Sequence, residues 1–121
     1  MRDPKQAVAH AQKAVELAPD QADYWNTLGV ARYRNGNWKS AIEALMKSAQ
    51  LRNGGDSFDF FFLAMAHWKL NEKEKARAWY DQAVAWMDNY SPQDEELKRF
   101  RDEAAALLGL AKAAELQKKK D

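Results

Sequence analysis

A repeat of 34 to 35 residues constrains the fold of this 121-residue chain more than any other feature. Ala7, Ala41 and Ala76 stand 34 and 35 residues apart. Each of them precedes, by seven positions, another small residue: Ala14, Ser48 and Ala83. A fixed period of this length is typical of repeat arrays, in which each unit packs mainly against its neighbours. We therefore expect one array of similar units without separate catalytic and accessory domains.

Helix-breaking residues divide the chain into segments whose apolar residues have helical spacing. Gly occurs only 5 times and Pro only 3 times, whereas strong helix formers abound. No segment alternates between apolar and polar residues for long enough to predict a strand. The sequence thus predicts an all-α fold. The expected helices cover about residues 4–18, 22–34, 38–51, 57–70 and 73–88, and a sixth begins at residue 91.

Residues between these segments predict how the helices begin and end. Gly36 and Asn71 are expected to adopt the left-handed backbone conformation that ends a helix. Asp56 or Ser57 is expected to cap the fourth helix. Ser91 is expected to cap the sixth, because a proline follows it and proline is favoured at the first helical position.

The repeated blocks resemble the tetratricopeptide repeat, whose pattern is Trp-x2-Leu-Gly-x2-Tyr, then Ala-x3-Phe, then Pro, over 34 residues. The first complete block matches at Trp25, Leu28, Gly29, Gly36, Trp38, Ala41, Ile42 and Leu51. The second matches at Phe60, Leu63, Ala64, Ala76, Tyr80 and Ala83. Arg32 and His67 stand where the pattern has Tyr, and Asn53 replaces the closing Pro of the first block.

This resemblance implies a right-handed superhelical solenoid of about two and a half repeats with a closing helix. The expected parts are a half repeat (4–21), two repeats (22–55 and 57–90), a capping helix (91–109) and a basic tail (110–121) that is either helical or frayed. The capping helix resembles the one that closes repeat regions in large bacterial multidomain signalling proteins. The start in mid-repeat is what a fragment of a longer array would show.

The resemblance also implies that the first helix of each repeat lines a concave groove that binds a partner protein. Residues 57–70 are apolar nearly all round, so this helix needs a second surface to bury against. The candidate groove residues are Asn26, Val30, Tyr33, Arg34, Phe58, Phe61, Met65, Trp68 and Lys69. Aromatic and Met side chains flanked by cations are typical of binding hot spots, which indicates an apolar ligand with acidic groups. Alternatively, the capping helix or the loop near residue 54 covers some of these aromatics.

Composition and missing motifs argue against most other functions. The formal charge of +1 gives no basic field for nucleic acid or an anionic membrane. There is no cysteine, and His10 and His67 lack ligand spacing, so we predict no metal site, no cofactor and no enzyme activity. No export signal or membrane span is recognised, which favours a cytoplasmic protein. We predict a monomer or weak homodimer, with self-association through the array ends or the closing helix as the alternative function.

Overall fold

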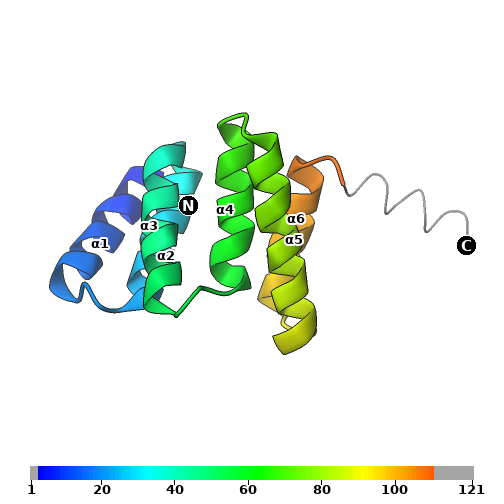
Figure 1. Ribbon diagram of the computed structural model, residues 1–121. Helices are drawn as coiled ribbons and strands as arrows, with labels where there is room; N and C mark the ends of the chain where they lie inside the picture. Colours follow the sequence, from blue (N-terminus) through cyan, green and yellow to red (C-terminus); the bar gives the residue numbers. More distant parts are fainter. Residues whose placement is uncertain (1–2, 111–121) are drawn as a thin grey trace, which may run out of the picture.

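The computed structural model describes residues 3–110, which form six α-helices and no strand (Figure 1). The helices are α1 (Pro4–Leu17), α2 (Ala22–Arg34), α3 (Trp38–Leu51), α4 (Ser57–Lys69), α5 (Lys73–Tyr90) and α6 (Glu95–Leu107). None of these helices is both long enough and apolar enough to cross a membrane. The predicted all-α repeat fold is confirmed.

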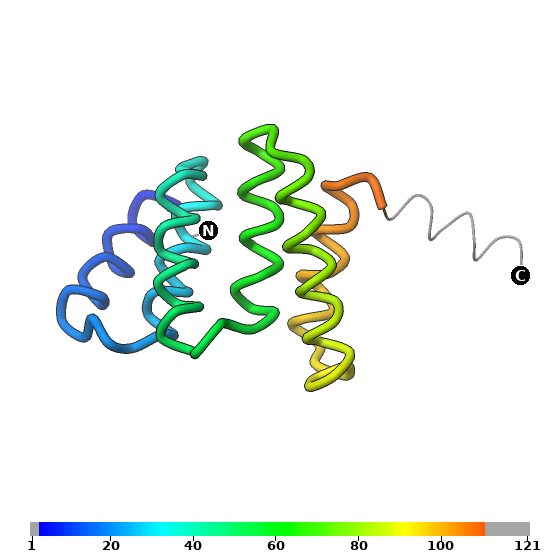
Figure 2. The backbone as a smooth tube through the Cα atoms, in the orientation of Figure 1, coloured from blue at the N-terminus to red at the C-terminus, as the bar shows by residue number. Residues whose placement is uncertain are grey.

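The helices are arranged as a row of hairpins. The tightest pairs are α2 with α3 and α4 with α5, and α1 packs on α2 as α3 packs on α4. The backbone trace in Figure 2 follows this row from α1 at one end to α5 and α6 at the other. In this order, α1 is followed by two helical hairpins and then by α6.

A glycine lets α2 and α3 approach closely within the first complete hairpin. A Cβ atom on Gly29 would lie 2.6 Å from Leu45 Cγ and 3.2 Å from the Ala41 carbonyl oxygen. Both distances are shorter than ordinary van der Waals contact. The glycine of the repeat pattern therefore makes room for a leucine on the opposite helix.

Most of the expected turns and caps are confirmed. Gly36 and Asn71 have φ angles of 81° and 63°, in the left-handed region expected of them. Of the two candidates for the start of α4, Asp56 is the cap, because its carboxylate accepts hydrogen bonds from the amides of Phe58 and Asp59.

The start of the sixth helix was predicted wrongly. Ser91 ends α5, donating its amide to the carbonyl of Met87, and α5 runs two residues beyond the expected position 88. The cap of α6 is Asp94, whose carboxylate accepts a hydrogen bond of 2.9 Å from the Leu97 amide. At the other end, α6 stops before Gly109, which has a φ angle of 80°. The predicted tail beyond residue 110 lies outside the described residues.

Candidate functional site

The closing helix α6 packs on α4, and its contact with α5 is much smaller. Phe100 of α6 makes edge-to-face contacts with Phe58 and Phe62 of α4, at ring-centre distances of 6.4 and 4.8 Å. Leu97 and Ala104 on the same side of α6 are fully buried. The second surface that the sequence requires for α4 is therefore provided largely by α6.

Three of the predicted groove residues, Tyr33, Phe61 and Met65, are part of the buried core, and Tyr33 also lines a hollow described below. Phe61 and Met65 are fully buried, and Phe61 packs against Tyr80 of α5 with ring centres 6.0 Å apart. The prediction that Phe61 and Met65 line an open groove is therefore wrong, because both side chains are buried. The physical reason is that α4 is enclosed between neighbouring helices, and a partner cannot reach these two side chains while α5 and α6 are in place.

The other two aromatic candidates on α4 are only half-buried. Phe58 lies against Phe100, as described above. Trp68 lies near the turn into α5, where the Lys73 ammonium is 5.2 Å from its ring centre. Neither Phe58 nor Trp68 lines either of two hollows that lie at the ends of α2, α4 and α6 and between α1, α2 and α6.

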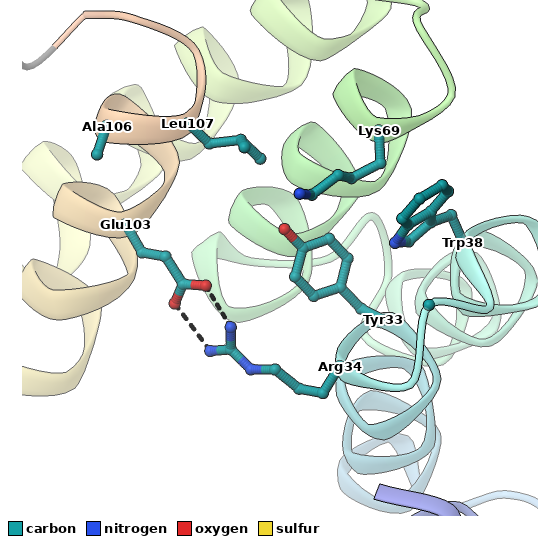
Figure 3. Close-up of a pocket in the computed structure, with 8 residues that line it drawn as sticks. Tyr33, Arg34, Trp38, Lys69, Glu103, Ala106 and Leu107 are labelled. Atoms are coloured by element: carbon teal, nitrogen blue, oxygen red, sulfur yellow. Dashed lines mark hydrogen bonds and ion pairs between the residues drawn. The ribbon is translucent and has the colours of Figure 1, made fainter.

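The first hollow, which we call the cationic pocket, lies where α2, α4 and α6 end (Figure 3). Its volume is about 580 Å³, and it is lined by Tyr33, Arg34, Gly36, Trp38, Lys69, Glu103, Ala106 and Leu107. Arg34 makes a two-pronged hydrogen-bonded ion pair with Glu103, one contact of which is 2.8 Å. The pair links α2 to α6 across the array. The hydrogen bond to Glu103 raises the pKa of the Arg34 guanidinium, so this side chain stays charged.

The remaining polar groups of the cationic pocket are Lys69 and Tyr33. The Lys69 ammonium lies 5.9 Å from the Trp38 ring centre, and within residues 3–110 it has no ion pair. Burial raises the pKa of Tyr33 to about 12, and the nearby Glu103 adds to the shift. The phenol is therefore protonated near neutral pH and can donate a hydrogen bond. Figure 3 shows the Tyr33 hydroxyl and the Lys69 ammonium on the same side of the pocket.

The second hollow, which we call the alanine groove, lies between α1, α2 and α6 and has a volume of about 640 Å³. It is lined by Pro4, Ala7, His10, Ala11, Ala14, Tyr24, Asn26, Thr27, Val30, Ala31, Arg34, Glu96 and Phe100. The predicted residues Asn26 and Val30 therefore lie here, and Arg34 lines both hollows. The candidates other than Phe58, Phe61, Met65 and Trp68 are brought to these two hollows.

Asn26 has a structural partner that sequence reasoning missed. Its side-chain amide donates hydrogen bonds to the Asp59 carboxylate (2.9 Å) and to the Phe58 carbonyl oxygen (3.0 Å). Asp59 is fully buried, and Arg52 Nε lies 3.5 Å from its second carboxylate oxygen. Burial raises the pKa of Asp59 despite these partners. This cluster joins the two complete repeats, and no local sequence pattern relates residues 33 positions apart.

The histidines and acidic residues do not form a metal site in the described part of the chain. Within residues 3–110, no three His, Cys, Asp or Glu side chains are grouped so that they could hold an ion. His67 instead contacts Glu72, with 2.8 Å between Nδ1 and the carboxylate. This hydrogen bond lowers the pKa of Glu72.

Comparison with known proteins agrees with the helical architecture. Models of the tetratricopeptide repeat match residues 1–57 and, separately, residues 60–88. The chain is 29% identical over 87 residues to mouse Superkiller complex protein 3. This match covers 72% of the chain but only 6% of the mouse protein. With two family models matching along most of its length and the helical hairpins that they describe, the chain belongs to the tetratricopeptide repeat family.

Proposed function

We propose that this chain is a non-catalytic protein-interaction module that binds an apolar partner segment carrying acidic groups at the cationic pocket. Tetratricopeptide repeats act as scaffolds for contacts between proteins. The name of the mouse relative places that protein in a complex, which is compatible with a role for its repeats in assembly. For the present chain, the proposal depends on what the described surface offers to a partner.

One observation carries the proposal: Lys69 lies in a hollow with a protonated phenol and apolar walls. Trp38 and Leu107 supply apolar surface, while Lys69 and Tyr33 supply hydrogen-bond donors. Arg34 is already paired with Glu103, so Lys69 is the cation left to attract a carboxylate. A partner carboxylate that binds here accepts a charge-assisted hydrogen bond from Lys69. The apolar residues beside it in the partner then pack against the apolar walls of the pocket.

Peptide selection followed by charge reversal tests this proposal. A displayed library of amphipathic acidic peptides is selected on the full chain, and the affinity of one enriched synthetic peptide is measured by fluorescence anisotropy. We expect Lys69→Glu to weaken binding about tenfold or more, and Lys69→Gln to weaken it less. Lys13→Glu is the matched control, because Lys13 is exposed on α1 and lines neither hollow.

The helix dipole offers another explanation for why Arg34 and Lys69 stand at these positions. Arg34 and Lys69 are both in the last turns of their helices, where positive charge offsets the negative end of the dipole. In that case Lys69→Glu lowers thermal stability but leaves peptide affinity unchanged. That result, or a selection that yields no binding peptide, would contradict the proposed function.

Self-association is the second candidate function. Leu17 at the end of α1 and Tyr90 at the end of α5 are 78% and 70% exposed, the highest values for large apolar side chains among residues 3–110. If they join copies of the chain, the mass measured by light scattering rises with concentration and falls to that of a monomer in Leu17→Ser or Tyr90→Ser. A constant monomer mass would exclude self-association.

A further inference from the structure

The cationic pocket already contains a carboxylate of the chain itself. Three of its lining residues carry a charge: Arg34, Lys69 and Glu103. Arg34 donates hydrogen bonds to both carboxylate oxygens of Glu103. The positive charge of Arg34 is thereby balanced, and Lys69 supplies the excess positive charge that an incoming anion meets.

The position of Glu103 follows from the way α6 packs. Phe100 stands three residues before Glu103, and its ring packs on Phe62 of α4 with ring centres 4.8 Å apart. Ala104, the next residue, is fully buried. Glu103 therefore lies at the edge of the buried side of α6. Figure 3 shows its side chain pointing from α6 toward Arg34, so the carboxylate is part of the pocket wall.

Arg34 is engaged by aromatic rings as well as by Glu103. Its guanidinium carbon lies 5.3 Å from the centre of the Phe62 ring and 5.7 Å from that of the Tyr33 ring. Together with the ion pair, these contacts favour the observed position of Arg34 over one turned toward a ligand. A group that enters the pocket thus binds Lys69 in the presence of a nearby negative charge.

The negative charge of Glu103 also reaches the hydroxyl group of Tyr33. Burial is the main cause of the raised pKa of Tyr33, and the additional effect of Glu103 is larger than the opposing effect of Arg34. At this hydroxyl, the ion pair therefore acts as a weak negative charge. A ligand that accepts a hydrogen bond from Tyr33 lies in the same field.

This field discriminates between ligands of different charge. The attraction of an anion to Lys69 grows in proportion to the anion's charge, whereas the cost of removing the anion from water grows with the square of its charge. Because Glu103 cancels the charge of Arg34, the remaining attraction suits one negative charge better than two.

We propose that Glu103 is a specificity-determining residue, through which the cationic pocket accepts a singly charged carboxylate and rejects a doubly charged phosphate. This inference rests on the proposed function and adds to it which anions the pocket takes. Its consequence is that a phosphate group on the partner, at the position that enters the pocket, prevents binding.

Three forms of the selected acidic peptide test this rule. An alanine scan first identifies the acidic residue that anchors the peptide, and this residue is then kept or replaced by cysteic acid or by phosphoserine. Cysteic acid has a tetrahedral group like that of a phosphate but only one negative charge, so it separates charge from size. At about pH 7.5, where phosphoserine carries nearly two charges, we expect the phosphoserine peptide to bind about fivefold more weakly than the other two.

Substitution of Glu103 should remove this preference. Glu103→Gln keeps an oxygen that can accept a hydrogen bond from Arg34 but has no charge, so the phosphoserine peptide should bind at least as tightly as the others. Glu95→Gln is the matched control, because Glu95 is exposed on the same helix and lines neither hollow. Should Glu103→Gln fail to fold, Arg34→Gln carries the test: it leaves the charge of Glu103 unopposed and should widen the difference.

Inorganic phosphate provides a measurement that needs no selected peptide. In a nitrogen-15 NMR titration, the amide signals of Tyr33 and Lys69 should shift at about fivefold lower phosphate concentration in Glu103→Gln than in Glu95→Gln. If the selection yields no binding peptide, the proposed function fails, and this titration still decides whether Glu103 excludes a dianion. Equal phosphate affinities of the two variants, or a cysteic acid peptide that binds as weakly as the phosphoserine peptide, would overturn the inference.

Discussion

Gly29 and Leu45 show how a single residue sets the distance between two helices. The glycine is part of the repeat pattern, and its counterpart in the second repeat is Ala64. The close approach of Leu45 leaves no room for a side chain at position 29. Packing of this kind tolerates little added volume.

We predict that Gly29→Ala lowers the free energy of unfolding by about 1–3 kcal/mol, although alanine favours the helical backbone. Urea unfolding followed by circular dichroism measures the effect. In Gly29→Ala combined with Leu45→Ala, the added methyl enters the space vacated by leucine. The double variant should thus lose less stability than the sum of the single losses, and strict additivity would contradict the close contact.

Asp59 is a second residue whose effect on stability can be predicted. Because burial raises its pKa above the ordinary value of 3.8, the folded chain binds more protons than the unfolded chain just above that pH. The contribution of Asp59 to the free energy of unfolding is therefore largest below pH 3.8. It falls as the pH rises through the pKa of Asp59 in the folded chain. At higher pH it is constant.

Asp59→Asn should remove this dependence. We expect the stability of the original chain, relative to that of Asp59→Asn, to decline from about pH 4 upward and then level off. Urea unfolding at a series of pH values gives the difference. A difference that grows with pH would mean that the ion pair with Arg52 outweighs burial.

At the scale of the elements, the sequence predicts the helices and most of their ends because each turn has its own local signal. It fails at the start of α6, where Ser91 and Asp94 are both good capping residues and only one can serve. The choice depends on how far α5 continues, which tertiary packing decides. The sequence also cannot tell which of two apolar stripes on α4 the next helix covers, so Phe61 and Met65 were assigned to a groove.

Paired substitutions test the cap of α6. We expect Asp94→Ala to cost about 1 kcal/mol of stability, because the Leu97 amide loses its hydrogen-bond acceptor. Ser91→Ala should cost much less, since Ser91 does not cap α6. Thermal unfolding of the two variants compares them directly, and equal losses would argue against the assigned cap.

Substitution of Phe100 tests whether the packing of α6 on α4 stabilises the fold. Phe100→Ala removes the ring that packs on Phe58 and Phe62, and we expect a loss of about 3 kcal/mol. Arg99→Ala, at an exposed position on the same helix, should change stability by less than about 0.5 kcal/mol. Equal unfolding midpoints for the two variants would mean that α6 contributes little to the core.

On the scale of the whole molecule, the cationic pocket and the alanine groove share Arg34, whose ion-pair partner Glu103 lines the cationic pocket. The repeat pattern predicts the array and several lining residues, including Val30 and Lys69. The groove's full shape could not be predicted, because it depends on where α6 lies and on the small size of Ala11. Both are tertiary features without a local sequence signal.

The most direct test of the central claim is a nitrogen-15 NMR titration of the full chain with the selected acidic peptide. If the partner binds where we propose, the amide signals that shift most belong to residues around Tyr33, Lys69 and Leu107. Signals of residues that do not line the pocket, such as those around the exposed Lys13 of α1, should remain unchanged. Shifts concentrated on α3 and α5, with the cationic pocket unaffected, would contradict the account.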